Sequence, residues 1–167
     1  MSSARAAYRI RQFFASLGAG LSAQERQIVA ARLGQEQQRL FYAMTARDQR
    51  HCLDVFYALR RGGCEDGEVL LAALLHDVGK GPVHLWHRVA YVLLRAIWPR
   101  LPARLAQPEG RGWRWAMASL ADHAARGAAL AEAAGTPAPV VELIRHHQRA
   151  DASDGRLALL RAVDDSC

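Results

Sequence analysis

The stretch VLLAALLHDVGK, residues 69–80, joins an uninterrupted apolar run to a histidine, an aspartate and a lysine. The run has no polar face, which is the pattern of a helix that is buried on all sides. His76 and Asp77 come at the C-terminal end of this helix, where the negative end of the helix dipole favours a cation. The sequence therefore predicts a central helix that delivers two side chains of metal-binding type to a cation site.

Lys80 is the only lysine of the chain, and arginine supplies every other basic side chain. An ammonium group is a compact charge on a flexible stem and differs from the planar guanidinium beside a phosphate. The structural alternative is a solvated loop lysine at the end of a helix. Its place directly after His76 and Asp77 favours contact with phosphoryl oxygens.

Length and composition fit one globular domain. The 167 residues are 51% hydrophobic and 23% charged, which disfavours disordered and fibrous classes. The three cysteines, Cys52, Cys64 and Cys167, lack metal-type spacing and indicate reduced thiols. The longest apolar stretch, residues 89–98, is broken by Arg95 and is too short for a membrane span. With no signal-peptide pattern at the N-terminus, we expect a soluble cytoplasmic protein.

The net charge of +6 is unevenly distributed. Residues 78–115 hold Lys80 and six arginines against Glu109 alone, and residues 1–44 are also basic. The segments that carry most of the histidines and aspartates are acidic. This arrangement suits a cationic metal that receives an anionic substrate.

Helical periodicity recurs from end to end, and no segment shows strand alternation, so the sequence predicts an all-α fold. Start and stop signals include a capping-box pair at Ser22 and Glu25, a Thr45 cap, and Gly62 with Gly63 as a stop. The expected helices cover a first segment around residues 10–17 and then about 22–34, 35–44, 45–62, 68–75, 83–98, 113–134 with a break near 122, 139–147 and 157–164.

Several histidines and aspartates coincide with predicted core faces. His51 borders the face of one helix, His147 continues another, and Asp164 extends the stripe of Leu157 and Leu160. A lone histidine of this kind is more often a hydrogen-bonded core residue than a ligand. Several together would cost about 1–3 kcal/mol for each group left unsatisfied, which favours a shared metal. Helical phase favours Asp164 over its neighbour Asp165, but both stay candidates.

The types of candidate ligand limit which metal ions the site would bind. Imidazoles with carboxylates suit divalent transition metals such as Mn, Fe, Co, Ni or Zn better than Ca or Mg. The absence of clustered cysteines in the sequence argues against a structural zinc site.

The order of these residues resembles the HD-domain superfamily of metal-dependent phosphohydrolases, over about residues 46–165. HDVGK resembles the HDIGK form of the family motif, DHAARGAAL with His123 and Gly127 resembles the HPxxGA segment, and LIRHHQ resembles the paired-histidine segment of the two-metal branch. The resemblance implies an all-α HD-domain helical bundle around two metals. It implies a first metal held by His51, His76, Asp77 and Asp164, and a second held by Asp77, His123, His146 and His147.

One signature of a related branch is absent. HD-GYP phosphodiesterases, which degrade cyclic di-GMP, carry GYP after the paired histidines, whereas residues 148–155 here read QRADASDG. This disfavours cyclic di-GMP as the substrate. We expect residues 1–44 to form an N-terminal helical appendage or part of the same domain. Residues 45–167 would form the HD domain, with a basic, aromatic helical insertion near 83–112.

The sequence thus predicts a phosphohydrolase or phosphodiesterase that hydrolyses a nucleotide or similar phosphoester, with Asp77 and Lys80 as catalytic residues. The alternative is a non-catalytic HD scaffold that binds a partner, an anionic membrane surface or nucleic acid. This alternative is suggested by residues 84–100, HLWHRVAYVLLRAIWPR, which have the composition of an interfacial helix. No nucleic-acid motif is present, and the sequence leaves the oligomeric state open.

Overall fold

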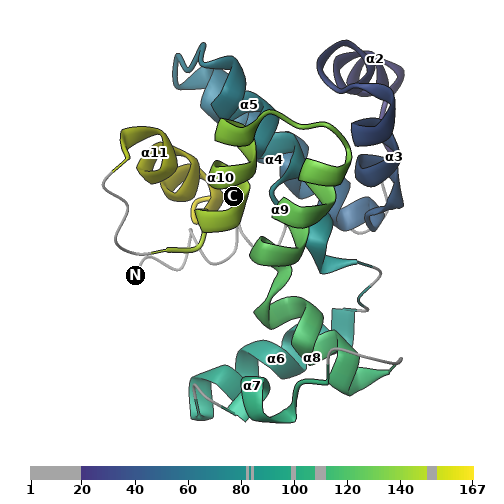
Figure 1. Ribbon diagram of the computed structural model, residues 1–167, viewed down its shortest axis with the longest axis vertical. Helices are drawn as coiled ribbons and strands as arrows, with labels where there is room; N and C mark the ends of the chain where they lie inside the picture. The colour runs from purple at the N-terminus through teal and green to yellow at the C-terminus, as the bar shows by residue number, and fades with distance from the viewer. Residues whose placement is uncertain (1–19, 82, 84, 99–100, 108–111, 150–153) are drawn as a thin grey trace, which may run out of the picture.

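The computed structural model describes residues 20–81, 83, 85–98, 101–107, 112–149 and 154–167, and these are helical without any strand (Figure 1). The predicted all-α fold is therefore confirmed. The helix expected around residues 10–17 lies outside the described residues.

The elements follow the predicted order closely. They are α2 (Ala23–Arg32), α3 (Gln35–Ala43), α4 (Ala46–Arg61), α5 (Gly67–Leu75), the short 3-10 turn η1 (Val78–Lys80), α6 (Leu85–Ile97), α7 (Leu101–Leu105), α8 (Trp113–Ala121), α9 (His123–Ala133), α10 (Ala138–His146) and α11 (Gly155–Asp164).

Local capping explains several of these boundaries. Ser22 and Glu25 form the expected reciprocal capping box, in which each side chain accepts from the other's backbone N–H. Thr45 caps α4 by accepting from the backbone N–H of Asp48. The expected break near residue 122 is present, because Asp122 separates α8 from α9.

Helix α7 is an element that the sequence interpretation missed. Pro102 occupies the second position of this helix. Proline is tolerated in the first turn because the N–H groups there have no partner within the helix.

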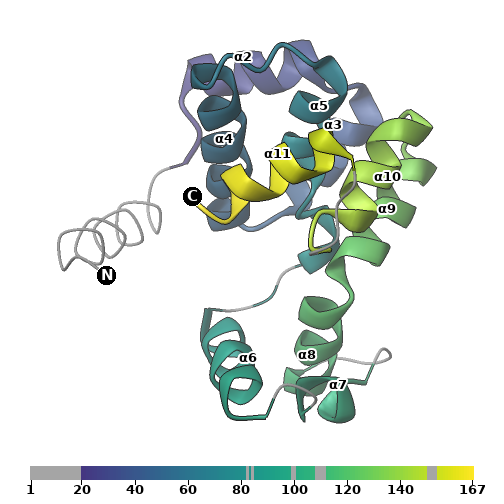
Figure 2. The same cartoon turned by 90° about the vertical axis from the view of Figure 1, so that its left-hand side faces the viewer.

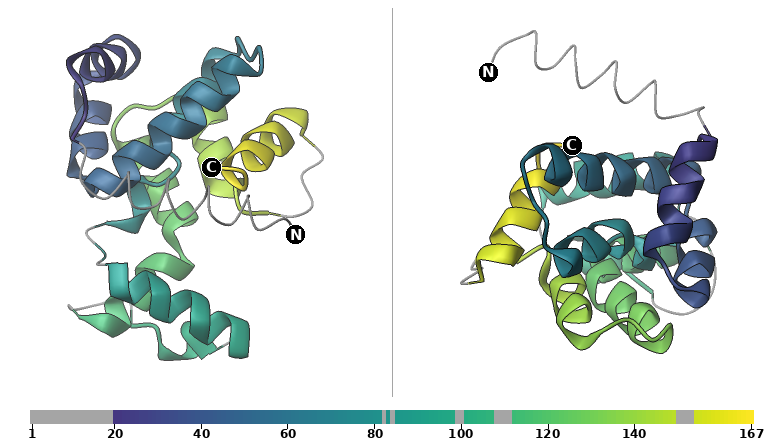
Figure 3. Two further views of the ribbon diagram at one scale, coloured as in Figure 1. Left: turned by 180° about the vertical axis from the view of Figure 1, so that it is seen from behind. Right: turned by 90° about the horizontal axis from the view of Figure 1, so that it is seen from above.

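The helices form two lobes, which Figure 2 separates clearly. The larger lobe contains α2 to α5 and α9 to α11 around one core, and α5 runs through it with both sides buried. Seen from behind, α4 crosses this lobe and α11 lies against it (Figure 3). The smaller lobe contains α6, α7 and α8 with its own core of Val83, Ala116, Met117 and Leu120. The N-terminal half of α4, the C-terminal ends of α5, α10 and α11 and the start of α9 meet inside the larger lobe.

The described part of residues 1–44 packs on the core of the larger lobe. Val29 and Leu33 of α2 and Phe41 of α3 are buried in it. A buried hydrogen bond of 3.0 Å from Gln37 Nε2 to Thr136 Oγ1 ties α3 to the connection between α9 and α10. These helices are therefore joined to the lobe that contains the site.

Among the described residues, no helix combines the length and the apolar character needed to cross a bilayer.

Candidate metal centre

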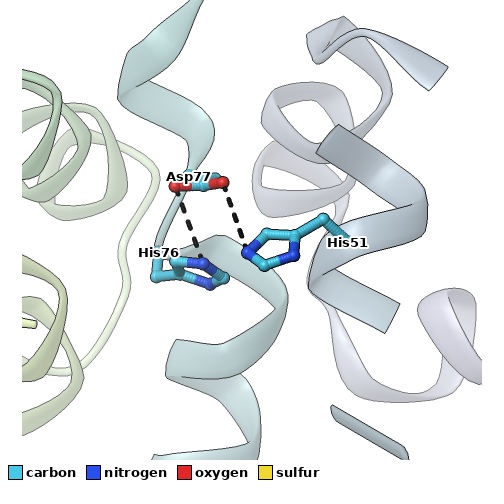
Figure 4. Close-up of side chains that lie close together, drawn as sticks. All are labelled: His51, His76 and Asp77. Atoms are coloured by element: carbon cyan, nitrogen blue, oxygen red, sulfur yellow. Dashed lines mark ion pairs between the residues drawn. The ribbon is translucent and has the colours of Figure 1, made fainter. Parts of the chain in front are cut away.

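Asp77 lies at the centre of the candidate site. Helix α5 ends at Leu75, and the chain then turns through His76 and Asp77 into η1. The carboxylate of Asp77 is 1% exposed and faces the imidazoles of His76 and His51, the latter from α4 (Figure 4). The apolar α5 therefore delivers a charged residue into the interior, as the sequence predicted.

A first group of ligand atoms surrounds one side of this carboxylate. His51, His76 and Asp77 each offer an atom, and all three lie within 4.8 Å of one another. Asp164, at the end of α11, completes the group: its Oδ1 lies 2.8 Å from His51 Nε2 and 3.4 Å from His76 Nε2. Four side chains from three distant segments thus face one point.

A second group shares Asp77. It contains Asp77, His123 from the start of α9 and His147 directly after α10, again with ligand atoms within 4.8 Å of one another. His123 Nε2 lies 3.6 Å from Asp77 Oδ1. The ring of His147 is 5.2 Å from that of His76 and 5.3 Å from that of His123. One carboxylate therefore belongs to both groups, which is the arrangement of a bridging ligand.

Three of the histidines are oriented in the same way. In each, Nδ1 lies within hydrogen-bonding distance of the backbone carbonyl three residues earlier, near the end of a helix where carbonyls lack helical partners. The pairs are His76 with Ala73 at 2.9 Å, His123 with Leu120 at 2.9 Å and His147 with Ile144 at 2.7 Å. A carbonyl only accepts, so Nδ1 donates and the Nε2 lone pair is left for the site.

The Nε2 atom of His76 provides a test of whether a cation fits. It is buried and has no hydrogen-bond partner, although carboxylate oxygens lie 3.4 and 3.6 Å away. An unsatisfied buried group costs about 1–3 kcal/mol, and a metal ion bound between this lone pair and the carboxylates would satisfy it. The donor set of imidazoles and carboxylates suits Mn, Fe, Co, Ni or Zn. The residues therefore fit a divalent transition metal.

The comparison with known families agrees with this geometry. Residues 49–165 match the family model of the HD domain. The chain belongs to the HD domain family. Proteins of this family are generally metal-dependent hydrolases, and the matched span contains every residue of the two groups. Comparisons with curated proteins and with solved structures gave no match.

Both carboxylates of the HD site are held in the ionised form. Burial acts to raise the pKa of Asp77, but Lys80 and His76 outweigh it and hold that pKa well below its usual range. Burial likewise acts to raise the pKa of Asp164, but the hydrogen bond with His51 and the nearby charge of His76 outweigh it and lower that pKa. Two negative charges are therefore available to a cation.

The pKa values of the buried histidines shift in different directions, depending on the groups around each ring. Burial lowers the pKa of His147 to about 4 and also lowers the pKa of His123, so both imidazoles are neutral near neutral pH, as metal ligands must be. Burial acts to lower the pKa of His76, but the charge of Asp77 outweighs it and raises that pKa well above its usual value. A cation at the Nε2 atom of His76 would therefore displace a proton that the same carboxylate stabilises.

Lys80 lies beside the shared carboxylate. The 3-10 turn η1 brings its Nζ to 2.5 Å from Asp77 Oδ2, and the side chain is 19% exposed. The lysine that the sequence singled out is therefore in direct contact with the HD motif, at its accessible edge.

The structure places the members of two pairs of neighbouring candidate residues differently. His146, predicted as a ligand of the second metal, lies in neither group; its Nε2 is 3.2 Å from Glu142 Oε2 on the outer side of α10. Adjacent helical residues point about 100° apart, and in this structure His147 is buried whereas the His146 side chain is 32% exposed. The same reason separates Asp164, which reaches the site, from Asp165, whose side chain is 70% exposed near Arg161.

Two residues contribute to the site without having been predicted to do so. Gln148 Nε2 lies 3.0 Å from His123 Nε2, so its amide donates to the lone pair that would face a metal. Gly79 allows η1 to touch α9: a Cβ atom there would lie 2.0 Å from the carbonyl oxygen of His123 and 2.5 Å from the backbone nitrogen of Gly127. The only sequence signal for the role of Gln148 is its position directly after the paired histidines. Gly79 could be recognised only from the packing.

Proposed function

We propose that this HD domain is a metal-dependent phosphohydrolase or phosphodiesterase that hydrolyses a nucleotide or a related phosphoester. The observation that carries the proposal is the placement of Asp77, whose carboxylate belongs to both groups of imidazoles. Its Oδ1 lies 3.6 Å from Nε2 of both His76 and His123, and its Oδ2 lies 3.9 Å from His51 Nε2. One bridging carboxylate between two nitrogen-rich groups is the arrangement of a two-metal hydrolytic centre.

The two metal sets follow from the distances. His51, His76, Asp77 and Asp164 would hold the first ion, and Asp77, His123 and His147 the second. With three protein ligands the second set leaves coordination positions open, as catalytic sites require. Bound together, the ions would supply a water of lowered pKa and a clamp for the attacking and leaving oxygens of a phosphoester.

The protein's own groups prepare this chemistry. The backbone carbonyls that accept from Nδ1 of His76, His123 and His147 fix the rings with Nε2 toward Asp77, so the ligands lose little freedom on binding. Lys80 places an ammonium group at the edge of the site, where it can contact phosphoryl oxygens and offset their charge.

The direction of substrate approach follows from exposure. The side chains of His76, Asp77 and His123 are at most 4% exposed, whereas His51, Asp164 and Lys80 are 27%, 21% and 19% exposed. A phosphate would therefore enter between His51, Asp164 and Lys80. The basic character of residues 78–115 favours an anionic substrate.

Metal analysis of protein purified without chelators tests the assignment. We expect about two transition-metal ions per chain, with one lost in His147→Ala and both retained in His146→Ala, its matched neighbour on the outer side of α10. Asp77→Asn should lose both ions and abolish hydrolysis of bis(p-nitrophenyl) phosphate. Equal metal loss in the two histidine variants would refute the second set. Undiminished hydrolysis by Asp77→Asn would refute the proposed activity.

A further inference from the structure

Helix α6 presents an apolar side to solvent. Its outer residues are large and exposed: Trp86 by 58%, Val89 by 49%, Val92 by 64%, Leu93 by 57% and Ile97 by 82%. Positions 86, 89, 93 and 97 follow one another at helical spacing and so form one stripe. Single exposed hydrophobic residues are ordinary, but a contiguous apolar stripe marks an interaction surface.

The other side of α6 is already used for packing. Tyr91 and Leu94 lie against the core of the smaller lobe, which contains Met117 and Leu120 of α8. Figure 2 shows α6 and α8 side by side in this lobe, with the larger lobe above both of them. The exposed stripe is therefore additional to the surface that the fold requires.

The sequence that contains the stripe is basic. Residues 78–115 contain seven basic residues and a single acidic one, Glu109, and α6 itself contains no acidic residue. Arg104 of α7 is exposed, and its guanidinium lies over the ring of Trp98, 5.6 Å from the centroid. Trp98 directly follows α6 and is 50% exposed, while Trp86 lies near the start of α6. Tryptophan near both ends of an apolar face, beside basic residues, is typical of helices that lie in a membrane interface.

We propose that α6 docks this protein on the surface of an anionic lipid bilayer, with the stripe of Trp86, Val89, Val92, Leu93 and Ile97 inserted among the acyl chains. The helix of 13 residues is about 20 Å long and would lie parallel to the membrane plane, because no described helix is able to span it. Arg104, exposed on α7 beside Trp98, would face lipid phosphates.

The charge and size of the surface argue against a second copy of the chain as its partner. Two such faces would bring like charges together. A helix about 20 Å long and 10 Å wide also offers a footprint on the order of 200 Å², well below the roughly 800 Å² per partner of a standard interface. A nucleic acid would match the charge but would leave the aliphatic stripe against water and phosphates. Anionic lipid satisfies both the charge and the apolar side chains.

Vesicle sedimentation of the full chain tests this inference. We expect binding to vesicles that contain phosphatidylglycerol, little binding to pure phosphatidylcholine, and weakening when the ionic strength rises above about 0.1 M, where the Debye length is about 10 Å. The double variant Val92→Glu and Leu93→Glu should bind at least about tenfold more weakly, because burying one such side chain is worth roughly a power of ten. Its matched control is Ala158→Glu with Leu159→Glu, an exposed adjacent pair on α11 that adds the same charge.

A second readout makes the result independent of the variants. Brominated acyl chains should quench the tryptophan fluorescence of the unmodified protein when it is bound. The inference would be overturned by no sedimentation with phosphatidylglycerol vesicles, by equal weakening in the control pair, or by a dimer in light scattering that the Val92 and Leu93 variant dissociates. Binding to single-stranded RNA that survives that variant, without vesicle binding, would equally overturn it. None of these measurements depends on the metal centre, so failure here leaves the proposed hydrolase activity standing.

Discussion

The contact between η1 and α9 makes Gly79→Ala a sharp test of how the HD site is assembled. The added Cβ atom would lie 2.0 Å from the carbonyl oxygen of His123 and 2.5 Å and 2.9 Å from the nitrogen and Cα of Gly127. All three are backbone atoms, which cannot rotate away as a side chain can. Because ordinary contacts are about 3.5 Å or longer, η1 must move away from α9 by on the order of 1.5 Å.

Two measurable effects follow from this displacement. Overpacking typically costs about 1–3 kcal/mol, and the rigid neighbours place Gly79→Ala at the upper end, so we expect the free energy of unfolding to fall by about 3 kcal/mol. Asp77 lies two residues before Gly79, and its Oδ1 is 3.6 Å from His123 Nε2. Moving η1 lengthens this distance, so the second metal should bind more weakly than the first.

Urea unfolding followed by circular dichroism measures the first effect, and calorimetric titration with Mn²⁺ measures the second. Gly67→Ala is the matched control, because a Cβ at this first position of α5 has nothing within 4 Å. The control should be neutral or more stable by up to about 1 kcal/mol. If Gly79→Ala keeps both its stability and two equal metal sites, the contact does not position Asp77.

Three further predictions concern single groups. Lys80→Met should lower the stability of the metal-free protein by about 3 kcal/mol, because it removes the nearest positive charge from the buried carboxylate of Asp77; loading with Mn²⁺ should remove most of this difference in a thermal melt, and an equal loss in both states would contradict the pairing. His147 has a folded pKa of about 4, below the 6.5 of the free side chain, so the unfolded chain binds more protons between these values and stability is lost as pH falls. His147 should contribute about 2 kcal/mol of loss between pH 7 and 5, measured as the difference between the metal-free protein and His147→Gln in urea unfolding. Asp66→Ala should cost about 1 kcal/mol, since the Asp66 carboxylate accepts from two backbone N–H groups in the first turn of α5; unchanged urea unfolding would show that water replaces the cap.

The sequence determined the class of fold and the order of the ligands. Apolar periodicity, the Ser22 and Thr45 caps and the break near Asp122 are local properties, so they could be recognised without tertiary contacts. The fully apolar run before His76 indicated burial for the same reason. Pro102 shows the limit of local signals, because proline ends one helix and begins another equally well.

Tertiary packing decided which neighbouring residue enters the site and which surface is left uncovered. His146 and His147 are equivalent as residue types, and only the packing of α10 turns His147 inward and leaves His146 beside Glu142. The close approach at Gly79 and the exposed stripe on α6 likewise depend on where other helices lie. A sequence fixes the phase of residues within a helix, since each residue turns by about 100°. The direction that this phase faces depends on the neighbouring helices, and these come from distant parts of the chain.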